Sequence, residues 1–112
     1  MPSNSIDFNT LNELKEIMGD DFDELISTFI SDGKIQLDKL KLAIDSTSAS
    51  EIRRIAHTLK GSCANLGAHP LSEICNKLER NATDNKLGEA KDLFEKIKTE
   101  YEQVKKALEE KF

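Results

Sequence analysis

This sequence contains little cysteine, and it has no segment that would direct the chain to or through a membrane. Cys63 and Cys75 are the only two cysteines among 112 residues, too few for a disulfide framework, and both fall on apolar helix positions. We therefore expect reduced thiols in the core of a cytoplasmic protein. The opening residues, MPSNSIDFNT, have neither the basic nor the apolar region of an export signal, and no apolar run approaches the roughly 20 residues that span a bilayer.

Proline is nearly absent as well, and β-branched residues never alternate over a long stretch. The only prolines are Pro2 and Pro70. Apolar residues recur instead at helical spacing, which predicts amphipathic helices. The chain has no glycine-rich phosphate loop, no βαβ pattern and no internal repeat. Its net charge of −5 argues against non-specific binding to nucleic acid.

The first half of the chain predicts a short helix followed by a long one. The short helix covers residues 9–18 and ends at Gly19, and Asp20 is expected to cap the long helix. Gly33 is the one interruption in the apolar stripe of the long helix. That stripe consists of Phe22, Leu25, Ile26, Phe29, Ile30, Leu37, Leu40 and Ile44.

The second half predicts three more helices. Ser48 and Glu51 fit a capping box that starts the third helix, and Gly67 suits its end. Pro70 fits the first turn of the fourth helix. The polar residues 81–85 are predicted to form a loop, and the last helix carries an apolar stripe over residues 90–108. The stripe of the third helix consists of Ile52, Ile55, Ala56, Leu59, Cys63 and Leu66.

These elements predict an all-α fold. The long helices are each apolar on one side and joined by short links, so they bury their stripes most simply against one another. We expect an antiparallel up-down-up-down four-helix bundle with an additional short N-terminal helix packed across it. A chain of this length is about one domain, so residues 1–112 are predicted to form a single helical bundle.

One histidine falls on the wrong face of the third helix for a core residue. At about 100° per residue, His57 lies about 150° from the centre of the apolar stripe and should point at solvent. Residues three and four positions away share its face. These neighbours are Arg53, Arg54, Lys60 and Gly61, with Ala64 two turns on.

The composition of this face suggests a reactive histidine. The three cations disfavour protonation of the ring, which keeps His57 nucleophilic, and they can neutralise an attached phosphoryl group. Gly61 costs about 1 kcal/mol relative to alanine inside a helix, so its presence asks for a reason. Clearing space so that another protein can reach the imidazole is one such reason.

The residues around His57 resemble a known family. The run AHTLKGSCANLGA at residues 56–68 is similar to the signature of histidine-containing phosphotransfer (HPt) domains, and LSEICNKLE at residues 71–79 resembles the helix that follows it in that family. The resemblance covers essentially the whole chain. It implies that His57 is phosphorylated, that Lys60 contacts the phosphoryl oxygens and that Gly61 opens the approach.

The resemblance also assigns roles to residues farther from the ring. Ser62 is carried over with the motif. Arg53, Arg54 and Ala64 are expected at the partner interface because they share the helix face of His57, where the cations would complement the acidic pocket of a receiver. Some members of the family have Gln at the position of Glu79, where it can hydrogen-bond the imidazole. A glutamate there either orients the ring, pairs with Lys60, or meets a phosphoryl group unfavourably, and the sequence leaves these alternatives open.

Together these features predict a phosphocarrier of a two-component phosphorelay, not an enzyme with kinase activity of its own. We expect His57 to accept a phosphoryl group from a receiver-domain aspartate and pass it to another. The partners would be receiver domains of a hybrid sensor kinase and of a response regulator, with no nucleic acid and no membrane. No cofactor is expected in this chain, and Mg²⁺ would be held by the partner receiver. We expect a cytoplasmic monomer, and a free-standing carrier if the printed sequence is the whole gene product.

Three alternatives compete with this interpretation. The dimerisation segment of a histidine kinase also displays a histidine on a bundle, but it typically has an acidic residue where this chain has Thr58. A purely structural or adaptor bundle would leave Gly61 and the cations without a cause. Zinc binding by His57, His69, Cys63 and Cys75 matches no common ligand spacing, so the sequence predicts no metal site.

Overall fold

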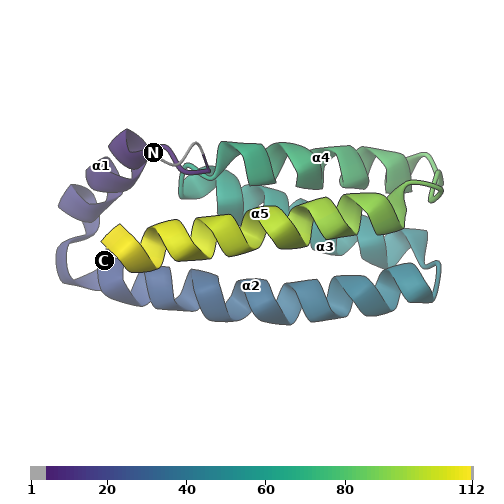
Figure 1. Ribbon diagram of the computed structural model, residues 1–112, viewed down its shortest axis with the longest axis horizontal. Coiled ribbons are helices and arrows are strands. Elements are labelled where there is room, and N and C mark those ends of the chain that lie inside the picture. Colours follow the sequence, from purple (N-terminus) through teal and green to yellow (C-terminus); the bar gives the residue numbers. More distant parts are fainter. Residues whose placement is uncertain (1–4, 112) are drawn as a thin grey trace.

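The computed structural model describes residues 5–111, which form helices joined by short turns (Figure 1). The elements are α1 (Phe8–Met18), a 3₁₀ turn η1 (Gly19–Asp21), α2 (Phe22–Asp45), α3 (Ala49–Asn65), α4 (His69–Thr83) and α5 (Ala90–Lys111). No strand occurs in this part of the chain, so the predicted all-α class is confirmed. No helix within residues 5–111 is both long and apolar enough to cross a membrane.

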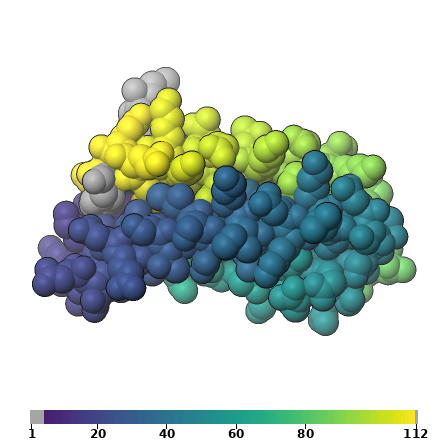
Figure 2. Space-filling view, turned by 90° about the horizontal axis from the view of Figure 1, so that it is seen from below, coloured from purple at the N-terminus to yellow at the C-terminus, as the bar shows by residue number. Residues whose placement is uncertain are grey.

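The four long helices, α2 to α5, close into a bundle. α2 packs against α3 and α5, and α4 packs against the same two helices. Figure 1 shows the four running alongside one another, and in Figure 2 α2 crosses the whole visible face with α5 along one side and α3 along the other. The predicted stripes meet in the centre, which confirms the four-helix bundle. The largest fully buried side chains include Phe22, Leu40, Ile52, Ile55, Leu71, Leu78, Ile97 and Leu108.

α1 lies across one end of the bundle, as predicted (Figure 1). Asp7 caps it, since its carboxylate accepts hydrogen bonds from the backbone N–H groups of Asn9 and Thr10. The Asp7 N–H in turn donates to the carbonyl of Gly67 at 2.9 Å. Gly67 has φ +80°, and a Cβ there would lie 3.0 Å from the Asp7 carbonyl oxygen. This glycine therefore ends α3 and also lets the segment before α1 approach closely.

Two predicted helix caps are wrong. Asp20 lies inside the 3₁₀ turn, and the residue before α2, Asp21, has helical backbone angles and makes no capping bond. Because the chain stays helical there, the extended geometry that a cap needs does not arise. Ser48 does precede α3 with extended backbone, but its side chain makes no capping bond. Glu51, the other half of the predicted box, pairs with Arg54 at 2.8 Å instead.

The predicted loop at residues 81–85 is also wrong in part. α4 continues to Thr83, whose hydroxyl donates to the carbonyl of Glu79 at 2.9 Å. The chain turns only afterwards, where Asn85 has φ +57°. The stretch resembles a loop because most of its residues are polar, although buried Ala82 continues the apolar face of Cys75 and Leu78 at helical spacing.

A close contact joins α2 to α5 at the middle of the bundle. A Cβ on Gly33 would lie 2.5 Å from the ring of Tyr101, so only glycine leaves room for that ring. The Tyr101 hydroxyl donates a hydrogen bond to the backbone carbonyl of Ile30 in α2. Burial raises the pKa of Tyr101 to about 12. The gap in the apolar stripe of α2 is therefore filled by a residue of α5.

Candidate functional site

His57 lies on the outer face of α3, as the sequence predicts. The buried residues of α3 are Ile52, Ile55, Ala56, Leu59 and Cys63. Helical geometry directs His57 away from that stripe, and its side chain is 68% exposed. The ring is therefore accessible to another molecule while the helix that carries it is fixed in the bundle.

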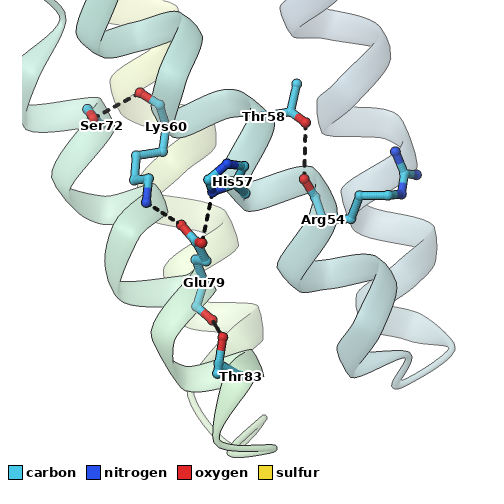
Figure 3. Close-up of polar contacts among 7 residues, drawn as sticks. All are labelled: Arg54, His57, Thr58, Lys60, Ser72, Glu79 and Thr83. Carbon is cyan, nitrogen blue, oxygen red and sulfur yellow. Dashed lines mark hydrogen bonds and ion pairs between the residues drawn. The ribbon is translucent and has the colours of Figure 1, made fainter.

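Glu79 of α4 holds the imidazole from one side (Figure 3). Its Oε2 lies 2.9 Å from Nδ1 of His57, and the Glu79 side chain is only 18% exposed. The Lys60 ammonium beside it and the hydrogen bond from His57 lower the pKa of the Glu79 carboxyl from its ordinary value. Glu79 is therefore ionised at neutral pH and can act only as an acceptor.

The bond to Glu79 determines which ring nitrogen carries the proton. Because an ionised carboxylate cannot donate, Nδ1 of His57 must be the donor at 2.9 Å. In the neutral imidazole the lone pair then belongs to Nε2. The contact with Glu79 therefore leaves Nε2 as the one ring nitrogen that can act as a nucleophile.

Lys60 contacts the same carboxylate from the other side. Its Nζ lies 2.6 Å from Oε1 of Glu79, so the two oxygens of Glu79 contact two different residues of α3. The hydroxyl of Ser72 donates to the backbone carbonyl of Lys60 at 3.0 Å (Figure 3). This hydrogen bond also joins α4 to α3, seven residues before Glu79. Of the alternatives for Glu79, the structure therefore contains both the contact with the ring and the pair with Lys60. The phosphoryl contact of Lys60 stays a prediction.

Gly61 and Ala64 place no large side chain on the surface of α3 beside His57. A Cβ built on Gly61 would meet no heavy atom within 4 Å, so nothing inside the protein requires a glycine at this position. Ala64 and Ser62 are both exposed. No contact within residues 5–111 explains Gly61, so the prediction that it opens the approach of a partner to His57 still stands as a prediction.

The two arginines are placed differently from Lys60. The Arg54 guanidinium pairs with Glu51 at 2.8 Å and points away from His57 in Figure 3. Its backbone carbonyl accepts a hydrogen bond from the Thr58 hydroxyl at 3.1 Å, and Arg53 is exposed. Since Arg54 and Lys60 each face a carboxylate, the surroundings of the ring are less positive than the sequence suggested. The spacing of Glu51 and Arg54, three residues apart on a helix, is a signal that could have revealed one of these pairs.

Sequence reasoning missed a groove on the other side of His57. It encloses about 430 Å³ between α1, α2 and α3. On α3 it begins at Thr58, the residue after His57, and continues along Ser62 and Asn65. Apolar side chains from α1 and α2 form much of its wall, among them Leu14, Met18, Leu25 and Phe29. The ring therefore stands on a ridge, with Glu79 on one flank and a mainly apolar groove on the other.

The cysteines belong to the core and not to this face. Cys63 and Cys75 are free and buried. A hydrogen bond with Cys75, together with burial, raises the pKa of the Cys63 thiol, which keeps it protonated and unreactive. Residues 5–111 contain no group of three or more His, Cys, Asp or Glu side chains that could hold a metal ion.

Comparison with known proteins connects this geometry to one family. The family described as "Hpt domain" matches residues 24–107. The crystal structure of histidine-containing phosphotransfer protein B (HptB) from Pseudomonas aeruginosa PAO1 is similar with a TM-score of 0.95 and 30% identity, over 98% of this chain and 96% of that one.

Two further relatives match this chain over different shares of their own lengths. Sensor protein TorS of Escherichia coli K12 is 36% identical over 77 residues, which cover 68% of this chain but only 8% of the sensor. The pseudo histidine-containing phosphotransfer protein 2 of Oryza sativa subsp. japonica is 29% identical over 108 residues, covering 94% of this chain and 72% of that protein. Because one relative is named as a pseudo form, similarity alone does not make a chain a phosphoryl acceptor. That conclusion has to come from the histidine and its surroundings.

Proposed function

Because this chain belongs to the Hpt domain family, a family of phosphocarriers and not of kinases, we propose that it carries a phosphoryl group on His57 within a two-component phosphorelay. It accepts the group from the aspartate of one receiver domain and passes it to the aspartate of another. The observation that carries this proposal is the state of His57, which is 68% exposed and has Nδ1 bonded to Glu79 at 2.9 Å.

The chemistry needs little from the carrier. The lone pair on Nε2 of His57 attacks the phosphorus of an aspartyl phosphate, a nitrogen–phosphorus bond forms, and the bond to the aspartate oxygen breaks so that a carboxylate leaves. In the second step a carboxylate of another receiver attacks phosphorus, and Nε2 leaves with its electron pair. Positioning and charge stabilisation supply most of the catalysis in such transfers. The receiver would hold the Mg²⁺, and this chain would need no cofactor of its own.

Glu79 supports the transfer as the ring changes charge. When Nε2 bonds to phosphorus, positive charge develops on the imidazole. The Glu79 carboxylate, at 2.9 Å from Nδ1, already faces that charge and stabilises it without reorganising. Glu79 also keeps the proton on Nδ1, so that the nucleophilic atom is Nε2 throughout.

The groove beside His57 is the surface on which we place the receiver. It adjoins the ring at Thr58, its wall is largely apolar, and the exposed Gly61 lies between the ring and Ser62. A partner helix with an apolar face would fill it and so bring its aspartate to the ridge. The exposed Arg53 and Ala64 would lie at the rim of the same contact. We propose that the protein acts in the cytoplasm, where it would meet its receivers. We also propose that it is a monomer, because α2 to α5 bury their apolar faces against one another within one chain.

Replacement of the acceptor tests the function. His57→Gln should abolish labelling by a phosphorylated receiver domain while leaving the melting temperature nearly unchanged, because exposed substitutions usually alter stability by less than about 0.5 kcal/mol. The label on the unmodified protein should be acid-labile and base-stable. His69→Gln is the matched control, since His69 is the other histidine of the chain and is also exposed. Wild-type labelling of the His57→Gln variant would reject the proposal.

A substitution in the groove tests the docking surface. Ser62→Arg should slow transfer from a receiver and leave labelling by phosphoramidate unchanged, because the small donor does not need the groove. Ser31→Arg serves as the control, since Ser31 is exposed on α2 but does not line the groove. Equal receiver rates in the two variants would place the docking surface elsewhere.

A further inference from the structure

Lys60 does not stand free beside the acceptor histidine. Its Nζ lies 2.6 Å from Oε1 of Glu79, while Oε2 of the same carboxylate lies 2.9 Å from Nδ1 of His57. The three groups therefore form a chain in which an ammonium holds a carboxylate and the carboxylate holds an imidazole (Figure 3). Among these contacts Lys60 reaches His57 only through Glu79.

The position of Lys60 is restricted by its surroundings. The Lys60 and Glu79 side chains are 30% and 18% exposed, so their pair is partly shielded from solvent. The hydroxyl of Ser72, seven residues before Glu79 on α4, donates to the carbonyl of Lys60 at 3.0 Å. Positions seven apart share a helix face. The contact of Ser72 with the Lys60 carbonyl and the contact of Glu79 with His57 therefore fix the register between α3 and α4 around the Lys60–Glu79 ion pair.

The lysine decides where the carboxylate points. A glutamate side chain has several rotamers, and a single hydrogen bond to a solvent-exposed ring would leave it free to turn toward water. The ion pair on Oε1 removes that freedom and presents Oε2 to Nδ1. If Lys60 turned away from Glu79 to hold a phosphoryl group, the 2.6 Å pair would be lost and Glu79 would face that group without its counter-charge.

We propose that Lys60 is a positioning residue for phosphoryl transfer, which acts by fixing Glu79 against Nδ1 of His57 and so keeps Nε2 as the nucleophile. This rests on the proposed function, and it departs from the direct contact between Lys60 and phosphoryl oxygens that the sequence motif implies. The two roles differ in one respect that can be measured. A positioning lysine matters only while Glu79 carries a charge, whereas a lysine that contacts phosphate matters whatever residue occupies position 79.

A double-mutant cycle on the full chain separates the two roles. Lys60→Ala should slow labelling by phosphoramidate about tenfold, because an imidazole that is no longer oriented presents Nε2 to the donor less often. Glu79→Gln keeps an oxygen that can accept from Nδ1 but needs no counter-charge. In that background the further change Lys60→Ala should alter the rate by less than about twofold. A tenfold loss in both backgrounds, or none in either, would overturn the positioning role.

A spectroscopic measurement keeps the test independent of transfer. The ¹⁵N chemical shifts of the His57 imidazole in the unphosphorylated protein report the share of the Nδ1–H tautomer. We expect that share to fall in Lys60→Ala and to remain at the wild-type level in Lys77→Ala, a control that removes an exposed ion pair of α4 with Glu89. If no variant accepts phosphate, the proposed function fails but the tautomer still decides the role of Lys60. An unchanged tautomer in Lys60→Ala would contradict the proposal.

Discussion

Gly33 and Gly61 both interrupt an amphipathic helix, and their surroundings are opposite. A Cβ on Gly33 would lie 2.5 Å from the ring of Tyr101, whereas a Cβ on Gly61 would meet nothing within 4 Å. Gly33 is buried between α2 and α5, and Gly61 is exposed one turn after His57. The comparison teaches that the same residue, at a similar cost to the helix, serves packing in one region and access from outside in the other. Substitutions at the two positions should therefore have opposite effects on stability.

The largest effect is expected at the packed glycine. Gly33→Ala should lower the free energy of unfolding by about 1–3 kcal/mol, because the ring of Tyr101 must move and its hydroxyl loses its place at the Ile30 carbonyl. Urea denaturation would measure the loss, while phosphoramidate labelling of the folded protein should remain normal. An alanine variant as stable as the wild type would mean that the Tyr101 ring has room to shift.

A large side chain at the open glycine should affect transfer and not folding. Gly61→Gln should slow acceptance from a phosphorylated receiver by about tenfold or more, equivalent to about 1.4 kcal/mol in the barrier. Labelling by phosphoramidate should change less, because the small donor needs less room. Both rates are measured on a variant whose melting temperature is at least that of wild type. Normal receiver-dependent transfer would remove the steric explanation for Gly61.

A small side chain at the same position sharpens the contrast in stability. Gly61→Ala should raise the free energy of unfolding by about 0.5–1 kcal/mol, because alanine restricts the unfolded chain and meets no atom in the folded one. Denaturant titration beside Gly33→Ala would show changes of opposite sign. A loss of stability in both variants would contradict the distinction between the two glycines.

The smallest expected effect is on the dependence of stability on acidic pH, through the carboxyl of Glu79. The pKa of Glu79 is lowered in the folded protein by Lys60 and then His57, from an ordinary value of 4.5. A carboxyl whose pKa is lowered on folding contributes stability above its unfolded value and loses that contribution as the pH falls through the folded value. Glu79→Gln should therefore reduce the dependence of stability on pH below about 4.5. Melting curves between pH 3 and pH 6 would test this, with Glu73→Gln as an exposed control on α4. Parallel curves for wild type and Glu79→Gln would contradict the pairing.

Much of this molecule could be predicted from apolar periodicity. The stripes on α2 to α5, the left-handed glycine after α3 and the exposure of His57 all follow from helical geometry applied to the printed residues. The errors lie where local signals compete. Ser48 has the extended backbone of a cap without the capping bond, and residues 81–83 are mainly polar although buried Ala82 continues the apolar face of α4.

The parts that could not be predicted depend on contacts between helices. The sequence offered the pair between Lys60 and Glu79 only as one of three alternatives, because it joins residues 19 positions apart and depends on the register of α4 against α3. The groove wall combines residues of α2 and α3 with Leu14 and Met18 of α1, which lies across the end of the bundle. Neither has a sequence spacing of its own, since side chains on different helices meet at positions that only the packed bundle defines.

The central claim is that His57 accepts the phosphoryl group on Nε2 because Glu79 occupies Nδ1. Heteronuclear NMR of the ¹⁵N-labelled protein after incubation with a phosphorylated receiver tests it most directly, since coupling between ³¹P and nitrogen identifies the bonded atom. We predict coupling to Nε2 of His57, with Nδ1 still protonated and His69 unchanged. Coupling to Nδ1, phosphate on His69, or no phosphohistidine at all would contradict the account.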